Sequence, residues 1–457
     1  MNAAATASRS AAIYKTIINA VSSWLIWILR IEVSSDYSWR SYKEWIPPAW
    51  EGKSQTCQNW LETRKAEVKE ENLWRIHDSL YDFSDFIKIH PGGSYWLEIT
   101  KGTDITEAFE SHHINVGPRN ILSKYFIKAA STKRNAPFTF KEDGFYMTLR
   151  RRVSEKLKSQ SIKPGPSRKS KMLIDSLCII TFLFAITAAK TQSYLLGVVA
   201  GLPLCLMVIA AHNFFHLRDN WRMYLFNLSF LTVRDWRISH AMSHHLYPNS
   251  LHDLEISMFE PWFQYLPRSD KPFTARFLSL LYFPIAYALI FYAEAFSRLL
   301  LYPDGLRELI PLAIPASMLL SGVPVLHALI WWSIIILSAS FIFGFIGLNA
   351  AHHHPNIHHD GDEPREDRDW GLYQLDTVKD RVEIKGSFFL VLVLFGDHTL
   401  HHLFPTIDHA YLDDLYPELE RTYKDFGIQH NMTTISDLII GQFKQLARIT
   451  RNKRSKG

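Results

Sequence analysis

The chain has 457 residues, of which 47% are apolar and 14% aromatic, and its formal net charge is +5. This length allows two or three domains, and a mean hydropathy near zero averages very apolar blocks with polar ones. The small, dispersed positive charge gives no reason to expect a nucleic-acid partner. The three widely spaced cysteines, Cys57, Cys178 and Cys205, exclude a disulfide framework and predict that the polar parts face the cytosol.

The first 55 residues predict an N-terminal amphipathic segment followed by a connector. Residues 13–30 are apolar, but Arg30-Ile31-Glu32 follows where a signal peptide would have its small-residue cleavage site. We therefore interpret this stretch as an interfacial amphipathic helix. Residues 31–55 are polar and rich in tryptophan, which indicates a connector.

Polar and apolar blocks divide the rest of the chain. Residues 56–130 form a soluble block with mixed helix and strand signals, and residues 131–171 predict a basic linker whose end lies on anionic lipid headgroups. A membrane domain is predicted for residues 172–440, followed by a basic tail at residues 441–457. A membrane crossing needs roughly 20 mostly apolar residues. The membrane domain contains five apolar blocks of about this length: 172–190, 194–213, 277–301, 309–326 and 328–350.

Three histidine groups stand beside these blocks: His212-Asn213-Phe214-Phe215-His216, His240-Ala241-Met242-Ser243-His244-His245 and His398-Thr399-Leu400-His401-His402. On a helix, residues three or four apart share a face, so each group aims two or three imidazoles at one point. Imidazole suits iron, copper, nickel and zinc, and eight imidazoles are too many for one tetrahedral zinc ion. The pattern indicates two metal ions, and iron best fits the chemistry considered below.

The positions of the histidine groups limit how often the chain crosses the membrane. Three apolar blocks separate the second group from the third, and three single crossings would place these groups on opposite sides. Either of two blocks could fail to cross the membrane. Block 309–326 contains three prolines, which disturb a straight helix, and block 277–301 contains the charged Glu294 and Arg298. We expect four crossings in two hairpins and leave the odd block open. Basic residues before and after the first hairpin indicate that the histidine side is cytosolic.

The soluble block contains a second metal-binding pattern. His90 begins the motif His-Pro-Gly-Gly, and His112 and His113 follow some twenty residues later in the sequence. Two histidines on loops beside short helices can hold an iron porphyrin from both faces, which blocks oxygen and leaves single-electron transfer. Residues 56–130 resemble the cytochrome b5 haem-binding domain in this motif and its flanks. The resemblance implies His90 and His113 as axial ligands of haem b, with His112 as the alternative to His113.

Acidic residues follow the proposed haem motif. Glu98, Asp104, Glu107 and Glu110 are expected either to place negative charge near the haem edge, where a basic reductase docks, or to form an ordinary solvated face. His77 is expected to be structural.

As a set, HxxxH, HxxxHH and HxxHH in apolar surroundings resemble the membrane fatty acid desaturase and hydroxylase family over residues 172–430. The family has an additional Asn and a His four residues later, which here gives Asn349, acting through water, and His353, with His352 as the fallback. The resemblance implies these metal ligands: His212, His216, His240, His244, His245, Asn349, His353, His398, His401 and His402. Asp397 and Asp408 are expected to orient ligand imidazoles by accepting their second N–H. The remaining histidines of this region are expected to be non-ligands: His252, His327, His354, His358, His359 and His409.

Two features depart from the family pattern. The third group starts with His398 where desaturases fused to an N-terminal cytochrome b5 usually have Gln, and the second group has three residues rather than two between its histidines. Both departures weaken any transfer of regioselectivity. The overall layout is most similar to the cytochrome b5-related proteins of insects.

The resemblances imply an α-helical integral membrane di-iron domain with a cytosolic helical cap, joined to an α+β cytochrome b5-like domain. The implied activity is desaturation of a lipid acyl chain, carried by acyl-CoA or phospholipid, with O2 as co-substrate. Electrons would pass from NADH through NADH-cytochrome b5 reductase to the haem and then to two non-haem iron ions. The expected location is the endoplasmic reticulum membrane, with the haem and the metal site facing the cytosol.

The acyl chain is expected in a kinked apolar tunnel that ends near His216 and His353. Its polar head is expected at the cytosolic surface, beside these residues: Arg218, Arg222, Arg234, Trp236 and Arg237.

Three alternatives stay open at the level of sequence. A hydroxylase could use the same metal site, and a membrane-tethered cytochrome b5-type electron carrier could have an inactive desaturase domain. The third is a zinc-dependent membrane hydrolase. The intact histidine groups argue against the carrier, and a hydrolase gives no reason for an attached haem domain.

Overall fold

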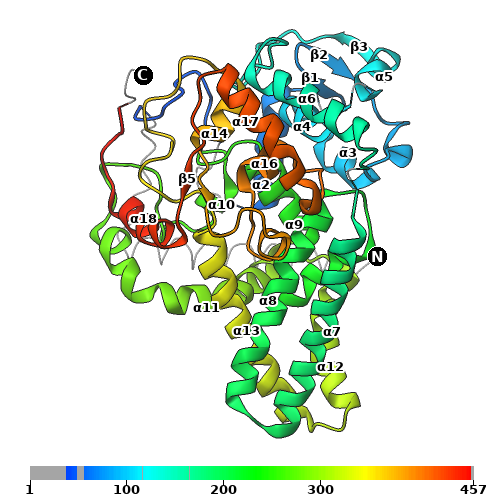
Figure 1. The fold of residues 1–457 in the computed structure, drawn as a ribbon, viewed down its shortest axis with the longest axis vertical. Helices are drawn as coiled ribbons and strands as arrows, with labels where there is room; N and C mark the ends of the chain where they lie inside the picture. Colours follow the sequence, from blue (N-terminus) through cyan, green and yellow to red (C-terminus); the bar gives the residue numbers. More distant parts are fainter. Residues whose placement is uncertain (1–37, 49–55, 71, 116, 164, 454–457) are drawn as a thin grey trace, which may run out of the picture.

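A computed structural model describes residues 38–48, 56–70, 72–115, 117–163 and 165–453 of the chain. The amphipathic helix predicted at residues 13–30 lies outside these residues. Figure 1 shows long helices that extend from a cap of short helices and loops, and a small domain with strands at the side of the cap.

The small domain is built on a three-stranded antiparallel sheet in the order β1-β2-β3. Its strands are β1 (Trp74–Ile76), β2 (Ser79–Tyr81) and β3 (Phe126–Ala129), and its helices are η1 (Ile87–Ile89), α3 (Ser94–Thr100), α4 (Thr106–His112) and α5 (Gly117–Tyr125). The preceding helix α2 (Cys57–Val68) packs on the cap instead, through Trp60 and Leu61. Trp74, Phe83 and Phe109 are buried together between sheet and helices. The predicted α+β block therefore has a hydrophobic core of its own.

The first two long helices form a tight hairpin. They are α7 (Arg168–Thr191) and α8 (Tyr194–His216). Ser167 caps the start of α7 by accepting from the amide of Ser170, and Gln192 ends this helix in the left-handed conformation. Ser193 then caps α8 by accepting from the amide of Leu196. These polar residues stop one apolar helix and start the next, and they place His212 and His216 at the far end of α8.

Among the described residues, four helices are long and apolar enough to cross a membrane: α7, α8, the segment Thr274–Leu301 and α13 (Val325–Leu348). The segment Thr274–Leu301 consists of the π-helical turn η4 (Thr274–Leu278) and α11 (Ser279–Leu301). Both of its ends lie on the side of the histidine groups. Before it, Lys271 Nζ donates to the carbonyl of Arg448 at 2.8 Å. Arg448 follows the helix Ile435–Ala447, which packs on His354 through Gly441. After it, the carbonyl of Pro303 accepts from Arg234 at 3.1 Å.

A helix that starts and ends on one side does not cross, so α11 lies along the membrane face, and in Figure 1 it runs across the direction of the long helices. The odd apolar block is therefore 277–301. The descending limb of the second hairpin is η5 (Gly305–Leu312) followed by α12 (Ala313–Leu320). Its turn lies beside the first hairpin's turn, because Trp331 Nε1 donates to the carbonyl of Ser193 at 3.2 Å. With η5 and α12 as the fourth limb, the described residues form two hairpins, which agrees with the expected arrangement.

Close packing of α8 against α13 depends on a glycine. A Cβ on Gly201 would lie 2.6 Å from the side chain of Ser338 and 2.7 Å from the backbone nitrogen of Ala339. Ser338 also donates to the carbonyl of Val198 at 2.7 Å. Small residues allow helices in a membrane to approach this closely.

We expect Gly201→Leu to destabilise the protein by at least about 2 kcal/mol, because the added atoms have no space and the helices must separate. The measurement is the thermal unfolding midpoint of the detergent-solubilised protein. Val199→Leu is the control, because Val199 is 38% exposed on the outer side of the same helix. Equal midpoints for the two variants would contradict this account of the contact.

The cap consists of short elements joined by loops. They are η2 (Trp221–Ser229), α9 (Val233–Trp236), η3 (Arg237–His244), α10 (Leu254–Ser257), α14 (Trp370–Asp376), β4 (Asp380–Arg381), α15 (Phe388–Val393), α16 (His398–Leu403), η6 (His409–Tyr411), η7 (Asp413–Leu415), α17 (Tyr416–Asp425), β5 (Met432–Thr433) and α18 (Ile435–Ala447). Strands β4 and β5 pair in parallel. Trp370 and Phe404 are fully buried at the centre of this region.

Much of the predicted linker 131–171 belongs to the core of the cap. Within it, α6 (Phe145–Ser159) buries Phe145, Leu149 and Val153, which lie four residues apart on one helix face. The many basic residues of this segment concealed the apolar stripe in the sequence. The boundary predicted at residue 440 also differs from the structure, because it falls inside α18.

Candidate functional site

Nine histidines from three helices and one loop converge into two clusters on the cap side of the long helices. In the first cluster, the ligand atoms all lie within 4.8 Å of one another: His212, His216, His240, His245 and His401. The second cluster meets the same criterion: His244, His352, His398 and His402. The structure therefore brings together all eight histidines of the three predicted groups.

The ninth histidine is His352, the fallback, and not His353. His352 Nε2 lies 2.8 Å from His398 Nε2 and 3.0 Å from His402 Nε2. The ring of His353 points elsewhere and stacks on Tyr265, with 3.6 Å between ring centroids. The Asn349 amide nitrogen donates to the carbonyl of Phe345 at 2.7 Å, while its Oδ1 is buried without a hydrogen-bond partner among the described residues.

The spacing of the nitrogen atoms fits metal coordination. His212 Nε2 lies 2.8 Å from His240 Nε2, 3.0 Å from His216 Nε2 and 3.1 Å from His401 Nε2. One imidazole nitrogen cannot form good hydrogen bonds with three others at once, because each carries at most one proton. Two ligands at right angles, each about 2.1 Å from a metal ion, are about 3.0 Å apart. The histidine set present therefore fits a metal ion with several imidazole ligands in each cluster.

A π-helical turn divides the second histidine group between the two clusters. In η3, the amide of His245 donates to the carbonyl of His240, five residues earlier, at 2.8 Å. This wider turn aligns His240 and His245 on one face, toward the first cluster, and leaves His244 to face the second. The additional residue between the histidines of this group, which departs from the family pattern, is accommodated by this turn.

Carboxylates and an amide support the imidazoles from behind. His240 Nδ1 lies 2.7 Å from Glu255 Oε1, His244 Nδ1 lies 2.9 Å from Asp253 Oδ2, and His402 Nδ1 lies 3.0 Å from Gln374 Oε1. Each contact holds the proton on Nδ1 and leaves the Nε2 lone pair for a metal. The acidic residues after the second group were visible in the sequence, but nothing there distinguished Gln374.

The two aspartates predicted for this role contact other groups. Asp397 accepts from the Tyr416 hydroxyl at 2.9 Å, and Asp408 accepts from the Ser170 hydroxyl and from the amide of Asn213. Asp408 thus fastens the start of α7 to the end of α8, which is a structural role. The prediction that these carboxylates orient ligand imidazoles was wrong, because their hydrogen bonds go to Tyr416, Ser170 and Asn213.

The electrostatic environment keeps several of the clustered imidazoles neutral. Burial, followed by the neighbouring imidazoles, lowers the pKa of His245, His401 and His402 well below its usual value. A neutral imidazole offers a lone pair, so these side chains are ready to bind a cation.

The histidines expected to be non-ligands lie outside both clusters: His252, His327, His354, His358, His359 and His409. Two of them have defined structural contacts. His409 Nδ1 lies 2.7 Å from Asn213 Oδ1 and its ring packs on His401. His252 stacks on Trp45 with 4.3 Å between ring centroids, which fastens the N-terminal connector to the cap.

In the small domain, His90 and His113 face each other with 6.2 Å between ring centroids. Two imidazoles that bind one iron from opposite sides, each through a nitrogen about 2 Å away, have centroids about 6.3 Å apart. The Nδ1 atoms bond to the carbonyls of Gly93 and Phe109, both at 2.9 Å, so the Nε2 atoms are left for the iron. His112 instead packs on Trp96. The geometry fits a haem held by His90 and His113.

Three of the four acidic residues near this site, Asp104, Glu107 and Glu110, are buried and paired, so they form neither the predicted reductase surface nor a solvated face. Arg134 bonds Asp104 at 2.8 Å and Glu107 at 2.5 Å. Glu110 is bonded by Arg119, Arg150 and His77. The ion pairs cross-link the small domain to the segment after it. Only Glu98 of the four lies outside these pairs.

Glu110 makes the stability of this region depend on pH. Burial alone would raise the pKa of Glu110, but hydrogen bonds from His77 and Arg119 and the charges of Arg119 and Arg150 lower it to about 2. The ionised form then contributes about 3 kcal/mol above pH 4.3, the usual glutamate value, and this contribution is lost as the pH falls toward 2. We expect Glu110→Gln to lower the denaturant midpoint, followed at the haem absorption band, much more at pH 7 than at pH 3.

The control for this experiment is Glu142→Gln. Glu142 also pairs with Arg119, but its side chain is 69% exposed, so the variant should stay close to the wild type at both pH values. A deficit of Glu110→Gln that is the same at pH 7 and pH 3 would contradict the proposed linkage.

The small domain is docked on the cap close to the third histidine group. The Tyr146 hydroxyl oxygen lies 3.1 Å from the carbonyl oxygen of Glu110 and 3.3 Å from that of Leu403, within hydrogen-bond distance of both. Thr406 donates to the carbonyl of His112 at 3.2 Å. The side chains of Tyr146 and Thr406 therefore connect the segment that holds His113 with the segment that follows His402.

A cavity of about 660 Å³ leads from the metal clusters toward α11 and α13, within the range of small-ligand sites. Its lining is mostly apolar and includes Phe259, Leu289 and Phe343, and it reaches His240, His352 and His353. Of the residues predicted to hold a polar head, only Trp236 lines it. Arg222 pairs with Asp175, Arg234 with Asp235, and Arg237 with Asp219.

Comparison with known proteins gives a consistent assignment. Residues 59–130 match the family model "Cytochrome b5-like Heme/Steroid binding domain", and residues 189–434 match "Fatty acid desaturase". A cytochrome b5-related protein of Drosophila melanogaster is 46% identical over 413 residues, which are 88% of this chain and 94% of that protein. No solved structure matches the chain.

More distant relatives include a probable Delta(5) fatty acid desaturase C of Dictyostelium discoideum, 26% identical over 82% of this chain and 91% of that protein. An acyl-lipid (8-3)-desaturase of Mortierella alpina is 20% identical over 81% of this chain and 92% of that protein. The desaturase model spans more than half of the chain and includes all three histidine groups. The chain therefore belongs to the fatty acid desaturase family, carries an N-terminal cytochrome b5-like domain, and is a membrane oxidoreductase of the desaturase type.

Proposed function

We propose that this protein introduces a double bond into a lipid acyl chain, using O2, two iron ions and electrons delivered by a haem. The iron ligands in this proposal are the nine clustered histidines, with Asn349 acting through water on the second ion. His353, which lines the cavity instead, is not a ligand. His90 and His113 hold haem b.

One observation carries the proposal: two imidazole clusters, of five and four members, lie at the inner end of an apolar cavity. When bound there, iron supplies the O2-dependent oxidation of an unactivated C–H bond, which no side chain can perform. The two-cluster arrangement favours this chemistry over zinc-dependent hydrolysis, since structural and hydrolytic zinc sites use four ligands or fewer from the protein.

The residues of the chain contribute orientation and exclusion of water. Asp253, Glu255 and Gln374 hold the imidazoles in one tautomer and one direction. The apolar walls, among them Ile290 and Phe343, exclude water and align an extended chain beneath the clusters. The docked small domain places the haem ligand His113 near the segment after the third histidine group, which supports electron delivery within the chain.

The proposal includes an external electron source and a location. NADH-cytochrome b5 reductase would reload the haem, in the endoplasmic reticulum membrane, with the cap and the small domain on the cytosolic side. The basic residues between the membrane helices support this orientation.

Expression in a desaturase-deficient yeast, with fatty acid profiling, tests the activity. We expect a new unsaturated product and two non-haem iron ions per chain in the purified protein. Growth under 18O2 separates the outcomes, because a desaturase leaves no label in the lipid and a hydroxylase does. Haem iron alone, with no product, would instead support an electron carrier and overturn the proposal.

A further inference from the structure

The cavity beneath the metal clusters has an unusual distribution of charge. Four carboxylates line it: Asp235, Glu255, Glu260 and Glu294. No lysine or arginine is among its lining residues in the described part of the chain. A negatively charged group brought into this cavity would meet like charges in a medium of low dielectric constant, which is costly.

Three of these carboxylates have charged or polar partners or neighbours in the protein. Glu255 contacts His240 and lies 3.7 Å from His244, and Asp235 bonds Thr232 and Arg234. Glu260 is near the charges of Arg268 and Lys271. Asp235 and Glu255 thus have bonded partners, whereas Glu260 has neighbouring charges.

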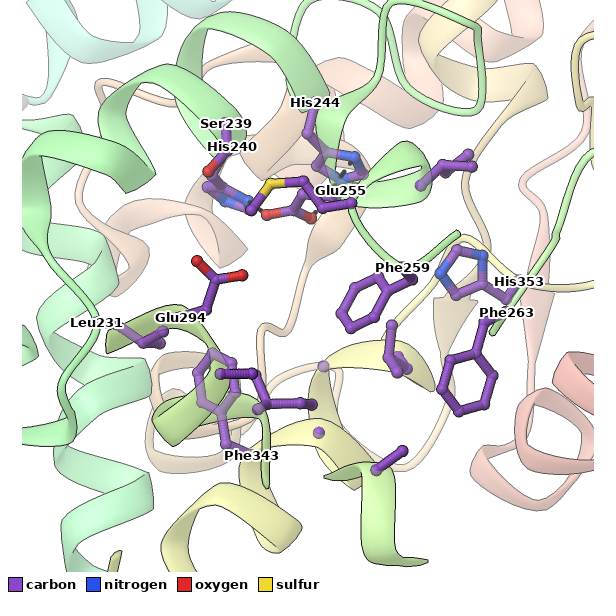
Figure 2. A pocket seen from close by; sticks show the side chains of 18 of the residues that line it. Leu231, Ser239, His240, His244, Glu255, Phe259, Phe263, Glu294, Phe343 and His353 are labelled. Atoms are coloured by element: carbon purple, nitrogen blue, oxygen red, sulfur yellow. Dashed lines mark hydrogen bonds and ion pairs between the residues drawn. The ribbon is translucent and has the colours of Figure 1, made fainter. Parts of the chain in front are cut away.

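Glu294 is the carboxylate that α11 contributes to the cavity. Within the described residues, no hydrogen bond or ion pair reaches its carboxylate, and Figure 2 shows this group pointing into the cavity, on the side of Ser239 and His240. The nearest cation on the helix, Arg298, is held by both oxygens of Glu308, at 2.7 and 2.8 Å. Arg234 is likewise engaged by the backbone at the end of α11. Arg298 therefore acts on Glu294 through its charge but forms no hydrogen bond or ion pair with it.

A carboxyl group in an apolar cavity without a hydrogen-bond partner is expensive, so a ligand that supplies one would stabilise it. Its place on α11 fits a contact with substrate, because this helix forms one wall of the cavity with Tyr282, Leu289 and Ile290. A substrate group that donates a hydrogen bond would satisfy the carboxylate, and a positive charge would also be attracted by the surrounding acids.

We propose that Glu294 binds a hydrogen-bond donor on the lipid, a hydroxyl or an ammonium group, and that the cavity excludes anionic heads such as carboxylate or phosphate. The preferred substrates are then long-chain lipids with a neutral or cationic, donor-bearing head. This inference rests on the proposed function for its chemistry, and it narrows the substrate class within it.

The test is binding of three matched probes, octadecylamine, octadecan-1-ol and octadecanoate, to the full-length protein in a neutral detergent. Competition against a radiolabelled octadecyl probe gives the affinities. We expect the amine to bind at least about tenfold more tightly than octadecanoate, with the alcohol between them. Glu294→Gln should reduce amine binding about tenfold and alcohol binding less than threefold, because the amide keeps an acceptor oxygen but removes the charge.

Glu294→Ala should weaken both amine and alcohol, and the haem spectrum of each variant verifies that the protein is folded. The matched control is Glu366→Gln, which removes the same charge at an exposed position outside the cavity and should bind all three probes as the wild type does. Equal affinity of the wild type for the three probes, or an unchanged amine affinity in Glu294→Gln, would overturn the inference.

Binding does not require turnover, so the two hypotheses fail separately. A protein that binds the amine through Glu294 but forms no unsaturated product contradicts only the proposed function. A protein that desaturates lipids regardless of the head group contradicts only the assignment of Glu294.

Discussion

Replacing His352 by alanine should reduce the non-haem iron content from two ions per chain to about one and abolish lipid oxidation. The reason is geometric: in the four-membered cluster, His352 Nε2 lies 2.8 Å from His398 Nε2 and 3.0 Å from His402 Nε2. Loss of a supporting residue behind a metal ligand typically costs 10–100-fold, and loss of a ligand in a four-member set should cost more than about 100-fold. Metal analysis of the purified protein and fatty acid profiling of expressing cells measure the two effects.

His353→Ala is the matched control, because it changes the neighbouring residue in the same loop. His353 stacks on Tyr265 and lines the cavity, so this variant should keep both iron ions and lose activity only through weaker substrate binding. If His353→Ala lost an iron ion and His352→Ala kept both, the ligand assignment would have to be reversed.

The second large effect concerns the haem. We expect His90→Ala and His113→Ala each to abolish the absorption spectrum of a haem with two imidazole ligands, because each removes one of two rings that face each other at 6.2 Å. Oxidation of lipid should then fall to the level supported by free cytochrome b5 in the host cell. Reduced-minus-oxidised spectra and the haem-to-protein ratio are the measurements.

His112→Ala should retain this spectrum. The ring of His112 bonds to the carbonyl of Ala108 at 2.9 Å and packs on Trp96, outside the gap between the two facing rings. A normal spectrum in His113→Ala, together with its loss in His112→Ala, would reassign the second ligand.

The sequence predicted the architecture well because its signals were large. The apolar blocks, the His-Pro-Gly-Gly motif and the three histidine groups are each visible without a structure, and the comparisons confirm both domains. Smaller choices depended on tertiary contacts. His352 and His353 are neighbours in a loop, and the local backbone conformation determines which of the two rings faces the cluster. The carbonyl of Thr377, 3.0 Å from His352 Nδ1, holds the ring of His352 in that direction.

The direction of apolar helices was also beyond the sequence. Composition makes 277–301 a better crossing candidate than 309–326, which is interrupted by prolines. The structure shows the opposite, because hydrogen bonds at Lys271 and Arg234 hold both ends of α11 at the cap. The charged residues on this helix, Glu294 and Arg298, were the one indication in the sequence, and they reflect its position at the cavity and the membrane face.

Docking of the small domain has a kinetic consequence for the proposed enzyme. A carrier on a flexible tether must find its acceptor by diffusion before each electron transfer. Here the contacts of Tyr146 and Thr406 hold the donor domain at one distance and orientation. The rate of electron delivery to the metal site is then limited by how fast the external reductase reduces the haem. Turnover should accordingly follow the abundance of the reductase and change little with the length of the chain that joins the domains.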